Sequence, residues 1–334
     1  MPSKKLSVAT LIITLLLAAC GPATAQPTAE LPTAELSVAT ETPSTDEILA
    51  EQIATWEAGS TASSESTTEP ATPTSTPAAD QSAPEDWRDA PIIPSAISDR
   101  AIEIYLQGVE MGNDPHAFSK VGDCGGTPSW FLGSFDLRPE YYSLGNYTYL
   151  EPVILYFAGS WERYSIAVSP GFNTASVFAP LWADPALCTA DEGPLQCEYR
   201  IHNPSIALIM LGTNDQFHPD EFEAPMREII EYSILQGVLP VLASKPDDLE
   251  DSGDAINSTI YKLAQEYEVP FWNFWAAIQH LPDKGLQEDG GHLTWAPNFF
   301  DDEFAMTRGW PYRNLTALQM LSQIWLALPD HQTP

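Results

Sequence analysis

The sequence is poor in basic residues. Its 334 residues include 14 Lys and Arg against 46 Asp and Glu, which gives a formal net charge of −32 at pH 7. Proteins that bind DNA or RNA neutralise phosphates with clusters of Lys and Arg, and this sequence contains no such cluster. We therefore expect no nucleic-acid partner, and interpret the acidic surface as a contribution to solubility.

Motifs for cofactors and metals are also missing. No Gly-rich dinucleotide or phosphate loop is present. The histidines at 218, 280 and 292 lack the spacing to cysteines or carboxylates that is typical of metal ligands. We expect no cofactor and no metal, and a monomer.

Residues 1–20 have the features of an export signal. Lys4 and Lys5 precede an apolar run, Leu6 to Leu17, that is too short to span a bilayer well. The ending Leu17-Ala18-Ala19-Cys20 resembles the bacterial lipobox, in which the cysteine becomes the lipidated N-terminus. Lipidation of Cys20 predicts an exported protein anchored in the cell membrane and facing the extracytoplasmic side. The alternative is an ordinary secretory signal cleaved after Ala25.

Residues 21–86 are rich in Pro, Thr, Ser, Ala and Glu, contain no Lys or Arg, and have almost no large apolar side chains. Such a segment cannot bury enough apolar surface to offset the entropy of ordering its backbone. We predict a disordered acidic tether, in which only residues 46–56 have a weak tendency to form a transient helix.

Cysteine is scarce, and Cys20 is assigned to the lipid. Outside the cytoplasm Cys188 and Cys197 are expected to close a short loop as a disulfide, between turn signals at Asp184-Pro185 and Gly193-Pro194. Cys124 would then be a free thiol. Each of the two other pairings would consume Cys124.

Residues 87–330 alternate apolar runs with amphipathic stretches, which is typical of a parallel α/β sheet in one domain. A helix is expected after Ser98, with Ile102, Tyr105, Leu106 and Val109 on its apolar face. Further helices are predicted at 220–236, 252–267 and 315–328. Strands are predicted at 118–122, 164–168, 206–211, 238–243 and 269–274. Residues 141–203 fit the pattern least well and predict loops or insertions.

Three short blocks contain residues suited to chemistry. They read Val121-Gly122-Asp123-Cys124-Gly125-Gly126, Gly212-Thr213-Asn214-Asp215 and Asp289-Gly290-Gly291-His292. Cys124, Gly171 and Asn214 each follow a predicted strand, and the carboxyl ends of parallel strands share one edge of a sheet.

In order and spacing the blocks resemble the SGNH (GDSL-type) hydrolases, a family of serine esterases and lipases. The resemblance implies a flavodoxin-like three-layer α/β/α sandwich with a mostly parallel sheet. The family's first block carries Ser where this chain has Cys124.

By this resemblance Cys124 is the candidate nucleophile, His292 the base and Asp289 the carboxylate that orients the imidazole. The backbone N–H groups of Cys124 and Gly171 and the side-chain amide of Asn214 would form the oxyanion hole. A thiol near an imidazolium can ionise and is a strong nucleophile, so the exchange does not exclude catalysis. Ser129 lies too far along the turn to replace it.

Three functions are compatible with these residues. The first is a surface-anchored hydrolase acting on an ester or an acetylated glycan. The second is an inactive SGNH-fold binding module, in which tryptophans stack on sugar rings; the candidates are Trp130, Trp161, Trp182, Trp295 and Trp310. The third is acyl transfer to a sugar instead of to water.

Overall fold

A computed structural model describes residues 43–60, 84–137, 139–250 and 254–329. The expected export signal, Cys20 and most of the predicted tether lie outside the described residues. Among the described residues no helix is long and apolar enough to cross a membrane.

The centre of the fold is a sheet of four parallel strands. Their spatial order is β1 (Asp114–Gly122), β3 (Pro204–Met210), β4 (Leu239–Ala243) and β5 (Phe271–Trp272). Strand β3 is buried from Pro204 to Ile209, as its continuous apolar sequence predicts for a strand covered on both faces. The predicted parallel α/β sheet is confirmed.

The segment at 164–168 is not a strand, so that prediction is wrong. Only Val168 pairs with the sheet, as an isolated parallel bridge to Gly122, and Tyr164 is 56% exposed. The segment is apolar in sequence, but its aromatic end faces solvent and only its last residue reaches the sheet. With Val168 counted as the second strand in the chain, the order is that of a flavodoxin-like sheet, and the strand order reverses between β1 and β3.

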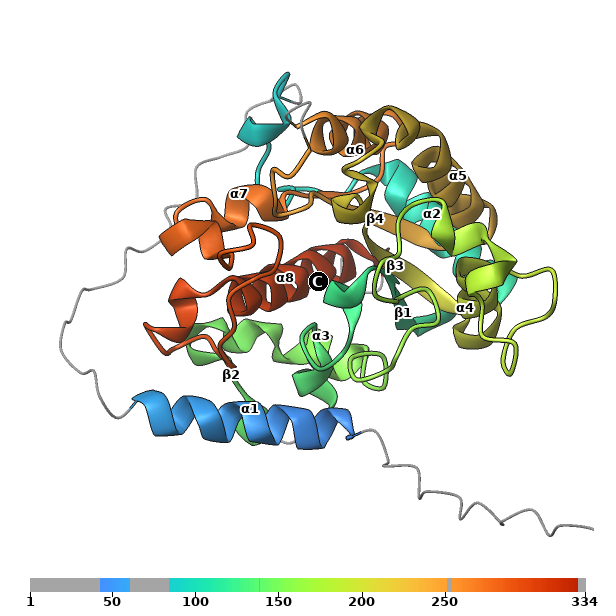
Figure 1. Cartoon of the computed structure of the whole chain (residues 1–334). Coiled ribbons are helices and arrows are strands. Elements are labelled where there is room, and N and C mark those ends of the chain that lie inside the picture. Colours follow the sequence, from blue (N-terminus) through green and yellow to red (C-terminus); the bar gives the residue numbers. More distant parts are fainter. Residues whose placement is uncertain (1–42, 61–83, 138, 251–253, 330–334) are drawn as a thin grey trace, which may run out of the picture. The chain divides into compact units, whose positions relative to one another are not determined.

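Helices cover the sheet on both faces (Figure 1). One layer contains α4 (Pro194–His202), α5 (Glu223–Leu235) and α6 (Ala255–Glu266). Tyr199 of α4 hydrogen-bonds Ser233 of α5 at 2.8 Å, and Arg227 of α5 forms an ion pair with Glu266 of α6.

The other layer contains α2 (Asp99–Met111), α3 (Glu151–Tyr156) and α8 (Gly309–Ala327). The hydroxyl of Tyr156 lies 3.3 Å from that of Tyr105 on α2, and its ring lies 6.0 Å from that of Trp325 on α8. Trp272 of β5 donates to Thr316 of α8 at 3.1 Å, and the short α7 (Phe274–Ile278) also packs on α8. The three-layer α/β/α arrangement is therefore confirmed.

Two helix predictions need correction. Helix α2 begins as expected, because Ser98 accepts the N–H of Ala101 at 3.0 Å, but its buried face differs from the predicted one. Leu106 is 38% exposed, whereas Ile104 is fully buried. The closing helix α8 begins at Gly309, six residues before the predicted start. Pro311 is compatible with this start, because N–H groups in the first turn of a helix have no partner within the helix.

The region at 141–203 is mostly turns and short helices, as predicted. It contains β2 (Tyr142–Ser143), which pairs in parallel with β6 (Asn298–Phe299) as a small second sheet.

Helix α1 (Thr45–Ser60) lies within the segment predicted to be disordered, so that prediction is wrong for these residues. Leu49 and Ile53 are buried in a cluster with Tyr141, and Trp56 stacks on Phe304 at 5.0 Å between ring centroids. Leu49, Ile53 and Trp56 are spaced by four and three positions, which places them on one face of the helix. The predicted boundary at residue 87 therefore excludes a helix that packs on the domain.

Candidate active site

A cavity of about 380 Å³ opens at the carboxyl ends of β1 and β3. Its lining includes every residue predicted for catalysis: Cys124, Gly171, Asn214, Asp289 and His292. In open parallel sheets ligands bind in this position, at the point where the strand order reverses. The structure thus brings together residues that are up to 168 positions apart in the sequence (292 − 124).

Cys124 directly follows the turn at the end of β1. Asp123 caps the short 3-10 helix Cys124–Gly126 by accepting the N–H of Gly125 at 2.8 Å. The thiol of Cys124 is free and half-buried. Its backbone N–H makes no hydrogen bond to any described residue, so this donor remains available to a ligand.

The other two expected oxyanion donors are also available. Gly171 has a φ of +81°, a conformation that favours glycine, and a Cβ there would meet no atom within 4 Å. Its N–H has no partner among the described residues. The amide of Asn214 donates to the carbonyl of Phe172 at 2.9 Å. That bond uses one of the two amide protons and leaves the second for a ligand.

Two buried carboxylates hold the turn that carries Asn214. Asp215 accepts the backbone N–H of Thr174 at 3.1 Å and its hydroxyl at 2.5 Å. Thr213 donates its hydroxyl to Asp247 at 2.6 Å, and Asp247 is paired with the buried Lys245 at 2.7 Å. Sequence reasoning included Asp215 in its block without a role and missed Lys245 and Asp247, which have no motif around them.

Asp289 and His292 form a closely bonded pair. The carboxylate accepts from the ring nitrogen Nδ1 at 2.6 Å, and it accepts the backbone N–H groups of Gly291 and His292 at 3.0 Å each. These bonds, those of the backbone first, lower the pKa of Asp289 to about 2. With Nδ1 donating, Nε2 keeps its lone pair for a proton from a nucleophile.

The pair is open to solvent, with 65% of the His292 side chain and 51% of the Asp289 side chain exposed. Among the described residues no hydrogen bond joins Cys124 to His292. Catalytic hydrogen bonds are often long in unliganded enzymes and shorten when substrate binds.

The surroundings of Cys124 favour the neutral thiol. Burial raises its pKa, and the neighbouring charge of Asp123 raises it further. Arg313 acts in the opposite direction. The resting cysteine is therefore a thiol at neutral pH, and attack requires removal of its proton.

Arg313 is a cavity residue that sequence reasoning missed. It is buried on α8 and donates from Nη1 to the carbonyl oxygen of Gly125 at 2.7 Å. Burial lowers its pKa to about 10, so the guanidinium stays charged at neutral pH. No sequence signal pointed to it, because the predicted helix began after this position.

The tryptophans suggested for sugar stacking differ in exposure. Trp161 is fully buried in the core, so this suggestion is wrong for it. Trp310 lines the cavity, and Trp130, which is 39% exposed, stacks on it with 6.0 Å between ring centroids. Trp182 and Trp295 do not line the cavity. Ser129 is buried and also outside the lining.

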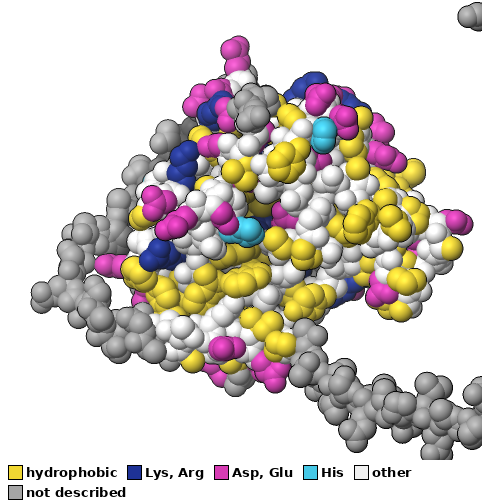
Figure 2. Space-filling view, in the orientation of Figure 1, with side chains coloured by type: hydrophobic (Ala, Val, Ile, Leu, Met, Phe, Trp, Pro, Cys, Tyr) yellow, Lys and Arg dark blue, Asp and Glu magenta, His cyan; other side chains and the backbone are white. Residues whose placement is uncertain are grey.

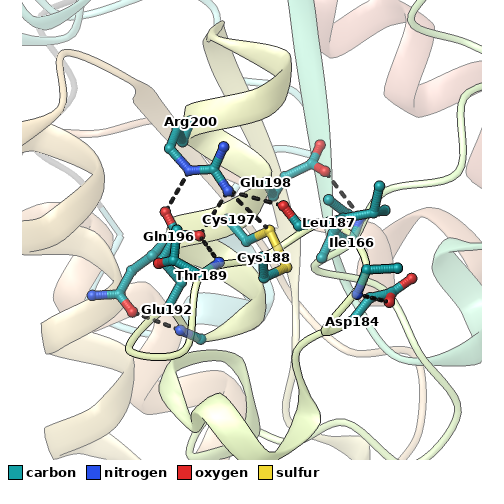
Figure 3. The surroundings of a disulfide bond; sticks show 12 residues. Ile166, Asp184, Leu187, Cys188, Thr189, Glu192, Gln196, Cys197, Glu198 and Arg200 are labelled. Carbon is teal, nitrogen blue, oxygen red and sulfur yellow. Dashed lines mark hydrogen bonds and ion pairs between the residues drawn. A yellow bond between two sulfur atoms is a disulfide. The ribbon is translucent and has the colours of Figure 1, made fainter.

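Cys188 and Cys197 form a disulfide across nine positions of sequence (Figure 3). Glu192, between them, pairs with Arg200, whose guanidinium also lies 3.7 Å from the Cys197 sulfur. This ion pair lowers the pKa of Glu192 to about 2. Cys188, Glu192 and Cys197 are the only cluster of three potential metal ligands in the described part of the chain. The disulfide leaves no thiolate there to bind a metal.

The sequence matches no family model and no curated protein. Solved structures similar to the chain include a psychrotrophic esterase from Pseudoalteromonas sp., at 14% identity and a TM-score of 0.39, covering 63% of this chain and 98% of the esterase. A GDSL-like lipase from Bacteroides thetaiotaomicron is also 14% identical, with a TM-score of 0.37 and coverage of 68% and 99%. An acetylxylan esterase from Geobacillus stearothermophilus has 14% identity, a TM-score of 0.38 and coverage of 63% and 94%. The chain is thus similar, at low identity, to solved esterases and a GDSL-like lipase.

Proposed function

We propose that the chain is an SGNH-type hydrolase that cleaves an ester with Cys124 as nucleophile. The carrying observation is that Cys124, the hydrogen-bonded pair Asp289–His292, and the two further donors Gly171 and Asn214 line one cavity. Acyl transfer needs a nucleophile, a base and donors for the developing oxyanion, and this set contains all of them.

The reaction proceeds in two steps. His292 takes the thiol proton on Nε2 as the sulfur attacks the ester carbonyl, and the oxyanion accepts from the N–H groups of Cys124 and Gly171 and the amide of Asn214. When the C–O bond breaks, the alcohol leaves with the proton from His292, and a thioester remains on Cys124. Water, deprotonated by His292, then hydrolyses the thioester and restores the thiol.

The substrate is an ester or an acetylated glycan. Trp310 lines the cavity, and Trp130, which is 39% exposed, stacks on it; aromatic rings of this kind suit the flat side of a sugar ring.

The test combines labelling and turnover. We expect iodoacetamide to label Cys124 without prior reduction, and the purified protein to hydrolyse short-chain acyl esters. Cys124→Ser should keep or gain activity, whereas Cys124→Ala should abolish it. Asn214→Ala should lower kcat by about 10²- to 10³-fold, as expected for one oxyanion donor. No turnover together with no labelling of Cys124 would exclude the hydrolase.

One observation favours a second function, a binding module without catalysis. Burial and Asp123 both raise the pKa of the Cys124 thiol, whereas cysteine nucleophiles usually have a lowered pKa. In that case the cavity binds a glycan, and binding survives both Cys124→Ala and His292→Ala.

A third candidate is an acyltransferase. An acyl-enzyme that transfers its acyl group to a sugar would differ from the hydrolase only in the product formed.

We further propose that the protein is exported and held at the extracytoplasmic side of the membrane by lipid on Cys20. The support is the sequence Leu17-Ala18-Ala19-Cys20 after a short apolar run. Wild-type protein should enter the detergent phase on phase separation and Cys20→Ser should not. If both proteins remain in the aqueous phase, cleavage after Ala25 is favoured.

A further inference from the structure

Arg313 carries a buried positive charge that no carboxylate neutralises directly. The residue is 5% exposed, and it forms no ion pair with any described residue. Burying a guanidinium without a paired anion is costly. The carboxylate that acts on its pKa is Asp123, which raises it against the effect of burial, and Oδ1 of Asp123 already accepts the N–H of Gly125.

The guanidinium also has donors to spare. Its one hydrogen bond to a described residue runs from Nη1 to the carbonyl oxygen of Gly125. Nε is buried and has no hydrogen-bond partner. A guanidinium has five N–H donors in a fixed planar arrangement. Most of those of Arg313 therefore have no acceptor among the described residues.

Two aromatic rings pack against the guanidinium. Phe131 lies 4.3 Å from the guanidinium carbon and Trp310 5.2 Å, measured to the ring centroids. A Cβ on Gly125 would come within 2.7 Å of Nη1, so the guanidinium packs closely against the turn that contains Cys124. Arg313, Gly125 and Cys124 all line the same cavity.

We propose that Arg313 is an anion-recognition residue, and that the substrate of this site carries a carboxylate close to the bond that is attacked. A carboxylate accepts two parallel hydrogen bonds from a guanidinium, which neutral acceptors cannot match in energy. The proposal rests on the proposed function in taking this cavity as the substrate site. It adds a substrate class: half-esters of dicarboxylic acids, or esters of acidic sugars.

The negative charge of the rest of the protein increases the importance of Arg313 for binding an anion. The protein has a net charge of −32, and acidic side chains are scattered over the face shown in Figure 2. The cavity lining itself contains Asp123 and Asp289 beside Arg313 and His292. Binding of an anion in the cavity is therefore favourable only if the anion pairs with Arg313.

The experiment compares two alkylating agents of similar shape, iodoacetate and iodoacetamide. Both react with the same thiolate, so the ratio of their rates at Cys124 is independent of its degree of ionisation. The ratio is measured on the full-length protein by mass analysis of the peptide containing Cys124, and is referred to the ratio for a small free thiol. We expect the ratio to exceed the reference by about tenfold, to fall below it in Arg313→Met, and to be intermediate in Arg313→Lys.

A ratio at or below the reference in the wild type, unchanged by Arg313→Met, overturns the proposal and leaves the hydrolase intact. Melting temperatures establish that both variants are folded. If Arg313→Met does not fold, the wild type and Arg313→Lys decide the outcome.

If Cys124 reacts with neither agent, the anion site is tested by calorimetry alone. Monomethyl succinate should then bind the wild type, and its neutral match dimethyl succinate should not. Equal binding of the two esters, or binding of neither, overturns the proposal.

Discussion

The carboxylate of Asp289 accepts both the ring Nδ1–H and the backbone N–H of His292, at 2.6 and 3.0 Å. One carboxylate three positions earlier in the chain thus fixes the position, the tautomer and the charge partner of the imidazole. The pKa of Asp289 is lowered to about 2, so its charge is present above the ordinary carboxyl pKa and is lost only as the pH falls through about 2.

Asp289→Asn should keep the fold and lose turnover. An asparagine can retain the backbone bonds through its oxygen, but it can present an N–H to the ring and favour the wrong tautomer. We expect kcat to fall by at least about a hundredfold, with only a small decrease in melting temperature because the side chain is half exposed. Asp283→Asn, at a position outside the cavity lining, is the matched control. Full activity of Asp289→Asn would show that His292 does not act as the base.

The ionisation of Cys124 should respond to its neighbour Asp123. The carboxylate raises the pKa of the thiol, so its removal should lower that pKa. Asp123→Asn can still accept the N–H of Gly125 and preserve the turn. We expect the pH midpoint of iodoacetamide labelling in the wild type to lie above the ordinary cysteine value of about 8.5, and to fall by about half a unit to one unit in the variant.

Asp248→Asn is the control for this measurement, because Asp248 is paired with Lys284 and does not line the cavity. A midpoint that stays constant or rises in Asp123→Asn would contradict the electrostatic account of the thiol.

The buried Lys245 should matter for both stability and activity. It is paired with Asp247 at 2.7 Å and also with Glu250, and all three side chains are almost completely buried. Lys245→Met would leave two carboxylates buried without a counterion, so we expect the free energy of unfolding to fall by about 3–5 kcal/mol. The support of Thr213 by Asp247 would weaken at the same time, with a loss of kcat.

Urea unfolding measures the effect against Lys262→Met, whose ion pair with Glu223 is at the surface. Exposed pairs contribute about 0–1 kcal/mol. Equal destabilisation by the two substitutions would show that the buried cluster has no special role.

The parts of the fold that the sequence predicted have a strong local signal. Strand β3 is an unbroken apolar run, and Ser98 caps α2 by a bond that its residue type predicts. Cys124, Asn214, Asp289 and His292 belong to short blocks whose order carries information. These features depend on few distant contacts.

The errors have tertiary causes. Helix α1 has a mostly polar sequence, and its helical state depends on packing of Leu49 and Ile53 beside Tyr141, which is distant in the chain. Arg313 is one cation on a helix, and only the close approach of α8 to Gly125 gives it a place in the cavity. Neither contact can be predicted from the local sequence pattern.

The disulfide Cys188–Cys197 should stabilise the domain without affecting the site. It closes a loop of nine positions, and loop-closure entropy predicts a contribution of about 2–3 kcal/mol to the free energy of unfolding. Neither cysteine lines the cavity. The double variant Cys188→Ala with Cys197→Ala should therefore unfold at lower urea, while its rate of iodoacetamide labelling at Cys124 stays at the wild-type value.

Cys124→Ala is the control, since it removes a sulfur outside the disulfide and should leave the reductant response unchanged. Dithiothreitol should lower the unfolding midpoint of the wild type and of Cys124→Ala alike, and have no effect on the double variant. If dithiothreitol leaves Cys124→Ala unaffected, then the stabilising bond involves Cys124. The thiol would then be consumed, and the cavity would lack its nucleophile.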